Sequence, residues 1–262
     1  MPTGRLETPI HGDAPTQKYP LLRNILPKPL HPVARSLKRK LKRVPADIKA
    51  PYRNVLPYIQ ASKARQISIV EKTKALIDRG VPGDFVECGV LDGGTAALMA
   101  HSARGTDRQL HLMDAWRGLP DATVKDGATA ARFNGHAVGS QRRALSALRD
   151  VDADLNNVTF HRGWFSETIP ECGIESIAFL HIDCDFYEPT KLVLNAFFHR
   201  LSPGAYVQLD DYTAFEGCRV AVNEFLDAHP EIELVVDAGG GGAVYFQMPD
   251  LATFYYDTRR AG

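Results

Sequence analysis

Apolar and polar positions become regularly spaced from about residue 58 of the chain. In residues 62–79, Ile67, Val70 and Leu76 recur at helical spacing with charged residues between them, which predicts an amphipathic helix. Gly80 follows this stretch and ends the predicted helix.

Short apolar runs that predict buried strands then alternate with helical patterns. The predicted strands cover residues 84–90, 109–113, 158–161, 177–182 and 205–209. The predicted helices cover residues 96–104, 140–149, 190–200 and 217–228. Residues 116–139 are rich in Gly, Ala and Asp and predict an irregular loop. This alternation predicts an α/β fold in which a parallel sheet carries helices on both faces.

Two last apolar runs, residues 233–236 and 243–247, flank the sequence GGGG. Their spacing predicts an antiparallel hairpin that closes the sheet. The complete expectation is therefore a seven-stranded, mostly parallel sheet with a C-terminal antiparallel hairpin.

Composition narrows the class of protein. The chain has 262 residues, 44% of them hydrophobic, which suits one α/β domain with a tail. A net charge of zero gives no reason to expect nucleic acid, and no apolar run approaches the roughly 18 residues of a membrane span. The N-terminus lacks the apolar centre of a signal peptide, and the four scattered cysteines suit reduced thiols better than zinc or disulfides. We therefore expect a cytoplasmic protein without a membrane partner.

The N-terminal region differs from the rest in charge. Residues 1–53 hold twelve Lys and Arg against three acids, most densely at residues 35–43, RSLKRKLKR. This run could anchor an anionic surface or a nucleic acid, but a short basic run more often belongs to a solvated tail or a loosely packed helix. Residues 1–30 contain six of the seventeen prolines. We expect residues 1–50 to form a basic, Pro-rich, partly disordered extension and residues 51–262 to form the domain.

Ligands of open α/β sheets bind beyond the carboxyl ends of the strands, and the first end reads ECGVLDGG over residues 87–94. Gly89, Gly93 and Gly94 allow tight turns and a close approach to a ligand. Their spacing is not the G-x-G-x-x-G of dinucleotide binding, so it suits S-adenosylmethionine, which has no phosphate. The glycines by themselves would also be expected in an ordinary turn that binds no ligand. Asp114, which ends the second strand, favours the ligand because an acid there can accept from both ribose hydroxyls.

The third strand is followed by Arg-Gly-Trp-Phe at residues 162–165. Trp164 or Phe165 could stack on an adenine ring, or either could be an ordinary aromatic residue of the core. The sequence leaves both possibilities open.

Acids cluster after the fourth and fifth strands. Asp183 follows one strand, and Asp210 and Asp211 follow its neighbour. Three carboxylates at one sheet edge repel one another unless protons or a cation neutralise them. Oxygen ligands without a nearby Cys or His pair suit a hard ion such as Mg²⁺. The other interpretation is that the acids cap helices or lie on the surface.

At this point the chain resembles the macrocin, mycinamicin and novobiocin type sugar O-methyltransferases of antibiotic biosynthesis. The resemblance covers roughly residues 58–249 and is carried by GDFVECGVLDGGTAALMA, LMDAWRGLP, RGWFSETIP, HIDCDFYEPTKLVL, RLSPGAYVQLDDY and GCRVAVNEFL. It implies the class I methyltransferase fold, whose sheet usually ends in such a hairpin. It also implies S-adenosylmethionine, Mg²⁺, a homodimer and a glycoside or sugar hydroxyl as acceptor, with the region before the first strand helping to form a lid.

The resemblance also implies roles for single residues. Asp183, Asp210 and Asp211 match the metal-binding aspartates, and Asp183 matches the proposed catalytic base. Asp185 matches an acid of less clear role, and Asp92 stands where the family commonly has a basic residue. The cofactor segments match at Glu87, Cys88, Gly89, Gly93, Gly94, Thr95, Asp114, Gly163, Trp164, Phe165 and Asp183.

Several alternatives remain at this stage. His181 could be the base, although a packed, hydrogen-bonded histidine is favoured there, as for His111 and His161. A metal-dependent hydrolase could use the three aspartates, but it would not need Asp114 or the glycine loop. A catalytically inactive binding protein would not need the intact acids. Among methyltransferases, a catechol acceptor offers the same vicinal diol as a sugar.

Overall fold

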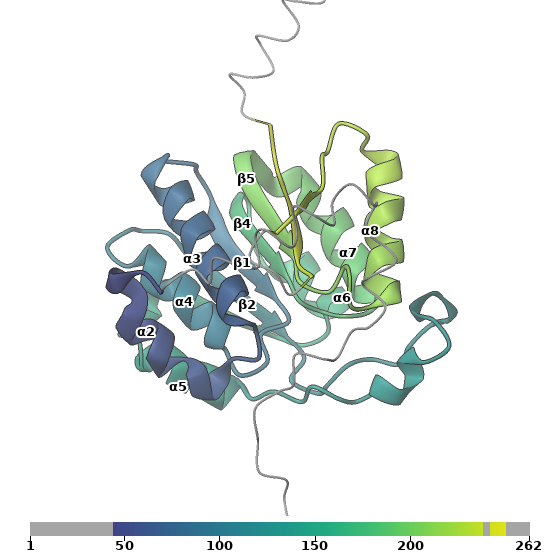
Figure 1. The fold of residues 1–262 in the computed structure, drawn as a ribbon, viewed down its shortest axis with the longest axis horizontal. Coiled ribbons are helices and arrows are strands. Elements are labelled where there is room, and N and C mark those ends of the chain that lie inside the picture. Colours follow the sequence, from purple (N-terminus) through teal and green to yellow (C-terminus); the bar gives the residue numbers. More distant parts are fainter. Residues whose placement is uncertain (1–43, 238–241, 250–262) are drawn as a thin grey trace, which may run out of the picture.

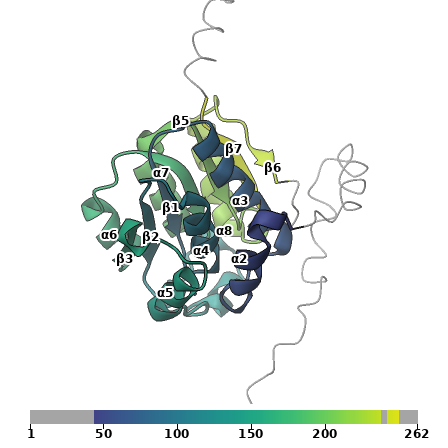
Figure 2. The same cartoon turned by 90° about the vertical axis from the view of Figure 1, so that its left-hand side faces the viewer.

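A seven-stranded sheet forms the centre of the computed structural model, which describes residues 44–237 and 242–249. The strand order is β3-β2-β1-β4-β5-β7-β6. Figure 1 labels β1, β2, β4 and β5, and Figure 2 labels β3, β6 and β7. The strands are β1 (Asp84–Cys88), β2 (Leu110–Asp114), β3 (Val158–Arg162), β4 (Ile177–Ile182), β5 (Leu201–Leu209), β6 (Val235–Val236) and β7 (Val244–Gln247). Strands β1 to β5 pair in parallel, whereas β7 pairs antiparallel with both β5 and β6. The predicted α/β fold and its closing hairpin are confirmed. The Pro-rich and basic stretches of the first 43 residues lie outside the described residues.

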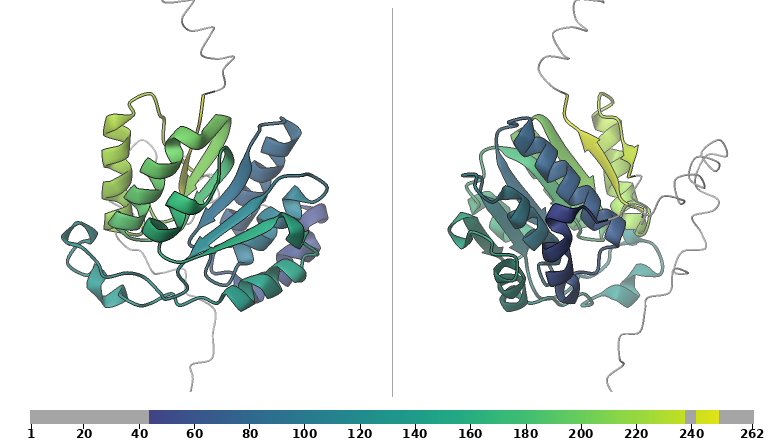
Figure 3. Two further views of the ribbon diagram at one scale, coloured as in Figure 1. Left: turned by 180° about the vertical axis from the view of Figure 1, so that it is seen from behind. Right: turned by 60° about the vertical axis from the view of Figure 1, so that its left-hand side comes forward.

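Helices cover both faces of this sheet (Figures 1 and 3). One face carries α3 (Lys63–Asp78), α4 (Gly94–Ala103) and α5 (Gln141–Arg149), with α2 (Lys49–Asn54) packed outside α4. The other face carries α7 (Tyr187–Phe197) and α8 (Glu216–Ala228), with the short α6 (Phe165–Thr168) beside α7. Short 3-10 turns are η3 (Ala46–Ile48), η4 (Leu56–Tyr58), η5 (Val124–Asp126), η6 (Ala130–Phe133), η7 (Leu155–Asn157), η8 (Ile169–Glu171) and η9 (Phe198–Arg200).

The hydrophobic core lies in two layers, one on each face of the sheet. All six residues of β4 are buried, and successive side chains point to opposite faces. Phe179 packs with Leu76 and Met99 on the α3 and α4 side, whereas Leu180 packs with Phe197 on the α7 side. A strand buried on both faces explains the uninterrupted apolar run IAFLHI in the sequence.

The structure begins β5 at Leu201, four residues before the predicted start. The added residues include Pro203 and Gly204, and the β4–β5 register shifts between Ile177 and Phe179. This irregularity lets the strand accommodate both residues. Helix α7 also begins before its predicted start, because a proline is tolerated in the first turn of a helix.

Two further expectations concern the cysteines and the membrane. All four cysteines lie in the described part of the chain, where each is buried and none is bonded to another. Across residues 44–237 and 242–249, none of the helices combines the length and the apolar character needed to span a membrane.

Candidate active site

A large pocket lies at the carboxyl ends of the parallel strands, with a volume of about 1200 Å³. It is open to the outside and larger than most single-ligand pockets, so it has room for two small molecules side by side. Of the predicted site residues, it is lined by Glu87, Gly89, Gly94, Thr95, Asp114, Gly163, Trp164, Phe165, Asp183 and Asp211. Three predicted residues do not line the pocket. Cys88 packs in the core, and protein atoms cover Gly93 and Asp210.

Asp114 holds the glycine loop in place. Its Oδ2 atom accepts from the backbone nitrogens of Val90 (2.8 Å) and Leu91 (2.9 Å), and its Oδ1 atom accepts from that of Trp116 (2.6 Å). Carboxylate oxygens have further lone pairs that can accept a ligand hydroxyl. The predicted ribose contact is therefore compatible with this structural role.

The glycines of this loop make room for neighbouring protein segments. Gly89 has φ of +90°, and a Cβ atom there would lie 1.9 Å from the backbone oxygen of Asp183. Gly93 has φ of +80°, and its Cβ would lie 2.5 Å from Cα of Ala144. The sequence suggested that these glycines admit a ligand, whereas in the structure protein atoms occupy the space.

Glu87 is buried at the floor of the pocket, where one of its oxygens has a partner and the other has none. Its Oε1 atom lies 3.0 Å from Nδ1 of His181, whereas Oε2 lacks a hydrogen-bond partner within the described part of the chain. Burial raises the pKa of Glu87 despite the neighbouring imidazole. A buried carboxylate oxygen without a partner is costly, so this atom suits a cationic ligand group such as the ammonium of a bound amino acid.

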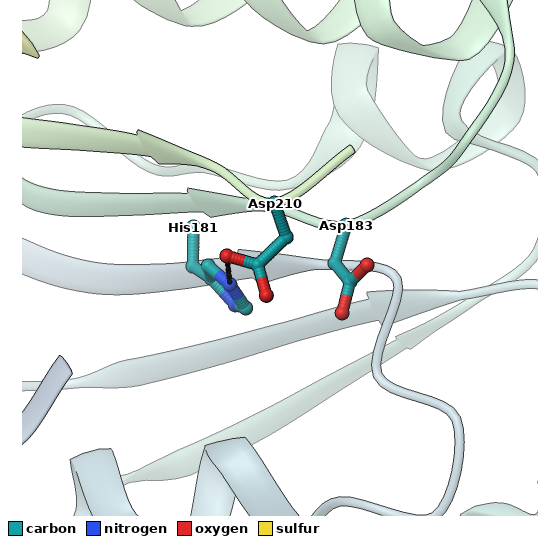
Figure 4. Close-up of side chains that lie close together, drawn as sticks. All are labelled: His181, Asp183 and Asp210. Atoms are coloured by element: carbon teal, nitrogen blue, oxygen red, sulfur yellow. Dashed lines mark ion pairs between the residues drawn. The ribbon is translucent and has the colours of Figure 1, made fainter. Parts of the chain in front are cut away.

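The carboxylates of Asp183 and Asp210 approach each other beside His181, as Figure 4 shows. One ligand atom from each of these three residues lies within 4.8 Å of the others, the only such group of His, Cys, Asp or Glu in the described ranges. Asp183 lines the pocket, whereas Asp210 is fully buried behind it. The acids are therefore not surface groups.

Asp210 remains ionised although it is buried. Burial opposes its ionisation, but His181 (Nε2 to Oδ1, 3.3 Å), Arg65 (Nη1 to Oδ2, 3.3 Å) and the Gln208 amide lower its pKa to about 2. Arg65 also donates to the Asp210 backbone oxygen at 2.6 Å and lines the pocket. The sequence offered no signal for Arg65, which reaches the acids from α3.

The other acids have pKa values shifted in the opposite direction. Burial, followed by the charge of Asp211, raises the pKa of Asp183 well above its usual range. Burial and the charge of Asp185 likewise raise the pKa of Asp211. Burial and Asp183 raise the pKa of Asp185 to about 7. A buried group of acids that resist ionisation together is a site that a divalent cation would neutralise.

Asp211 and Asp185 are joined through the backbone. The Asp185 nitrogen donates to Oδ2 of Asp211 at 3.0 Å, and Asp185 has φ of +60°, which is uncommon for a residue with a side chain. The backbone oxygen of Asp211, rather than its carboxylate, accepts from Ala214 and Phe215 and closes the turn before α8. The interpretation of these acids as helix caps is therefore not supported.

The three predicted structural histidines are all hydrogen-bonded. His181 is fully buried between Glu87 and Asp210, which raise its pKa against the effect of burial. His111 and His161 lie away from the pocket on β2 and β3, with Nδ1 and Nε2 3.0 Å apart. The expectation of packed histidines is met.

The outer wall of the pocket comes from the loop predicted at residues 116–139. Asp126 anchors this loop because its Oδ1 accepts from the first backbone nitrogen of α7, that of Tyr187, at 2.6 Å. Its Oδ2 accepts from the backbone nitrogen of Thr123 at 2.7 Å. Phe133 of the same loop meets Phe215 with ring centroids 5.6 Å apart. The sequence gave no reason to single out Asp126.

The residues present suit Mg²⁺ as well as the cofactor. Asp183 and Asp211 line the pocket and Asp210 lies behind it, and carboxylate oxygens are the hard ligands that Mg²⁺ prefers. Of these acids, Asp183 and Asp210 share with His181 the group of close ligand atoms, whereas Asp211 lies outside that group. Glu87 and Asp114 line the pocket together with Gly89 and Gly94 of the glycine loop.

Comparison with known proteins identifies the family. The model of the family described as macrocin O-methyltransferase (TylF) matches residues 40–247. The chain belongs to this family. This chain is 34% identical over 186 residues to a demethyldecarbamoylnovobiocin O-methyltransferase from Streptomyces niveus. The match covers 66% of this chain and 68% of the relative. The chain is 33% identical over 178 residues to a mycinamicin III 3''-O-methyltransferase from Micromonospora griseorubida, covering 63% and 69%.

The fold of this O-methyltransferase agrees with that assignment. The solved structure of the O-methyltransferase NovP superposes with a TM-score of 0.66 at 30% identity, covering 73% of this chain and 82% of NovP. The protein is therefore an enzyme of the O-methyltransferase type with the class I fold, as the sequence predicted.

Proposed function

We propose that this enzyme transfers a methyl group from S-adenosylmethionine to a hydroxyl group of a sugar, with Mg²⁺ bound by Asp183, Asp210 and Asp211. The observation that carries the proposal is the group formed by Asp183, Asp210 and His181, which lies beside a pocket that Asp211 and the glycine loop also line. A hydrolase or an inactive binding protein of this fold would have no use for that combination.

The cofactor site is assigned to the part of the pocket around the glycine loop. Gly89, Gly94 and Thr95 line it, and Glu87 offers the unpartnered oxygen for the methionine ammonium. Asp114 lies where the ribose hydroxyls would bind. The segment Gly163, Trp164 and Phe165 lines the pocket beside Asp114 and is assigned to the adenine. Cys88 and Gly93 support the loop from behind.

Asp183 is assigned the role of the general base, which accepts the proton of the acceptor hydroxyl. This carboxylate lines the pocket, as a general base for a bound hydroxyl must. His181 is enclosed by Glu87 and Asp210 and has no exposed surface, which argues against it as the base. When bound, S-adenosylmethionine supplies an activated methyl group and Mg²⁺ lowers the pKa of a coordinated hydroxyl.

The acceptor is proposed to be a sugar of a glycosylated natural product, in antibiotic or related secondary metabolism. The names of the two relatives support this, because one names demethyldecarbamoylnovobiocin and the other mycinamicin III. A vicinal diol would place two oxygens on the metal. A catechol presents the same pair of oxygens and is the second candidate.

The remaining expectations stay part of the proposal. We expect a cytoplasmic homodimer whose partner is a small glycoside or sugar, without nucleic acid or membrane. Residues 1–50 are proposed as a basic extension that is partly disordered or contributes to a lid, with residues 51–262 as the methyltransferase domain.

The proposal is tested with the full chain, S-adenosylmethionine and three acceptors: a macrolide glycoside, a nucleotide sugar and a catechol. Mass spectrometry should detect a methyl ether of one of the sugars only when Mg²⁺ is present, and EDTA should abolish it. Methylation of the catechol alone would replace the sugar proposal. Methyl transfer that is unchanged in EDTA would remove the metal from it.

A further inference from the structure

A strap formed by residues 54–62 borders the pocket beside the glycine loop. It leads from α2 to α3 along the side of the molecule that carries α4 and α5 (Figure 2). Tyr58, Ile59, Gln60 and Ala61 of the strap line the pocket. The strap therefore bounds the same space as the residues assigned to the cofactor.

The strap lies directly against the loop. A Cβ atom at Gly94 would lie 2.4 Å from Cβ of Ile59. No larger residue fits at position 94 unless the strap moves away. The position of the strap and that of the loop are thus linked at this contact.

Arg143 of α5 joins the strap to the loop through a single guanidinium group. Its Nε atom donates to Oδ2 of Asp92 in the loop at 2.8 Å, and its Nη2 atom donates to the backbone oxygen of Pro57 at 2.6 Å. The same group lies 5.2 Å from the ring centroid of Tyr58. Guanidinium can make such contacts together because its donors form a rigid planar fork.

Three further hydrogen bonds hold the two ends of this arrangement. Asp92 also accepts, through Oδ1, from the backbone nitrogen of Ser140 at 3.1 Å, just before α5. At the other end of α5, Asp150 accepts from Tyr58 (2.8 Å, through Oδ2) and from the Asn54 amide (2.6 Å, through its backbone oxygen). Helix α5 is therefore the support to which both loop and strap are attached.

We propose that Asp92 and Arg143 are positioning residues that fasten the strap over the cofactor, so that they set how long the cofactor stays bound. The proposal rests on the proposed use of S-adenosylmethionine. It gives a role to Asp92, which does not itself line the pocket.

The exposure of the pair suits a contact that opens and closes. The side chain of Arg143 is 47% exposed and that of Asp92 is 24% exposed. Solvent weakens ion pairs at such positions, so the contact holds the strap without locking it. A cofactor that is exchanged after each turnover requires this balance.

The test measures binding and release of S-adenosylhomocysteine by the full chain, with calorimetry for Kd and stopped-flow fluorescence for the dissociation rate. Arg143→Ala and Asp92→Asn should each speed release about two- to fivefold, as expected for the loss of a partly exposed ion pair. Arg143→Lys should resemble Arg143→Ala, because an ammonium cannot span both acceptors. Arg142→Ala, a change at the adjacent position of α5, should behave as the unmodified chain.

A second readout separates positioning from general destabilisation. In the unmodified chain, S-adenosylhomocysteine should slow amide hydrogen exchange across residues 55–62, and this protection should be lost in Asp92→Asn while β1 and β4 stay protected. The double variant Asp92→Asn/Arg143→Ala should be no worse than Arg143→Ala alone, because the two residues act through one contact.

The outcomes are distinguishable. If the unmodified chain does not bind S-adenosylhomocysteine, the proposed function fails. If it binds, and the variants at Asp92 and Arg143 release the ligand at the unmodified rate with the strap still protected, the fastening role is wrong. Asp92→Asn is nearly isosteric and keeps an oxygen for Ser140, so it decides the question even if Arg143→Ala does not fold.

Discussion

Lys72 donates from Nζ to Oε1 of Gln208 across 2.9 Å, and this contact fixes which way the Gln208 amide points. An ammonium group can only donate, so the amide oxygen faces Lys72 and the amide nitrogen faces Asp210, whose Oδ1 accepts at 2.9 Å. Lys72 also pairs with Asp237 at 2.9 Å. A buried lysine on α3 thus orients a carboxylate of the proposed metal site.

Replacing Lys72 should therefore be costly. Lys72→Met leaves the carboxylate of Asp237 buried without this cation, and breaking a buried pair in this way costs about 3–5 kcal/mol. The free energy of unfolding from urea titration checks this. Lys74→Met is the matched control, because Lys74 on the same helix pairs with Asp47 at the surface, where an ion pair contributes about 1 kcal/mol or less. Equal losses in the two variants would contradict the buried role of Lys72.

Asp210→Asn should abolish most of the activity. The substitution keeps the shape of the side chain but removes the charge that His181 and Arg65 hold ionised. We expect turnover to fall at least about 100-fold, with a higher Mg²⁺ concentration needed for half-maximal rate. Asp227→Asn, at an exposed position of α8, should leave both quantities unchanged. Retained turnover with the original Mg²⁺ dependence would show that Asp210 is not part of the metal site.

The stability of the metal-free enzyme should fall as the pH rises from about 4 to about 7. Burial raises the pKa of Asp185 from 3.8 to about 7, so across this window the folded state keeps a proton that the unfolded state has released. Stability from this group is complete below pH 4 and is lost as the pH rises through 7. Asp210, whose pKa is about 2, is ionised in the folded state throughout the window, and above about pH 5 it is ionised in the unfolded state as well, so it adds little slope there.

Urea unfolding in EDTA between pH 5 and pH 8 measures this effect. Asp185→Asn should make the pH dependence shallower, and added Mg²⁺ should stabilise the unmodified enzyme more at pH 8 than at pH 5. A stability that rises steadily across the window in the metal-free enzyme would be inconsistent with the raised pKa.

Gly89→Ala should prevent stable folding around the site. Gly89 has φ of +90° and its Cβ would overlap the backbone oxygen of Asp183, so strain and overlap together should cost about 3 kcal/mol or more. Gly105 also has a positive φ, +78°, but no atom lies within 4 Å of its Cβ position. Gly105→Ala should therefore cost about 1 kcal/mol. Thermal unfolding of both variants makes the comparison, and a similar loss in each would leave only backbone strain as the cause.

The architecture was predictable because each strand of the parallel sheet is a short apolar run and each helix keeps its period. The start of β5 was not predictable from the sequence. Pro203 and Gly204 fit within the strand because the register between β4 and β5 is irregular, and that irregularity depends on the neighbouring strand. Helix α2 was also missed. It is short, and it is held by packing of Ile48 and Val55 against Leu98 rather than by a strong pattern of its own.

The acids of the site were predictable for a related reason. In a parallel sheet the ends of neighbouring strands meet, so Asp183 and Asp210 had to lie close together. Arg65 and Arg143 could not be found in this way, because each reaches the pocket region from a helix distant in the sequence. Their roles follow from tertiary packing, which residue spacing does not encode.

The way Asp126 anchors the outer loop has a consequence for how such an enzyme can diversify. One carboxylate satisfies the first amide of α7, and a Cβ at Gly217, at the start of α8, would collide with it. The loop is thus attached at the ends of two helices, and its tip around Phe133 shares no hydrogen bond with the acids below. Residues between Gly127 and Gly139, Phe133 among them, line the pocket. We therefore expect a change of acceptor to require new residues in this segment while the acids below keep their contacts.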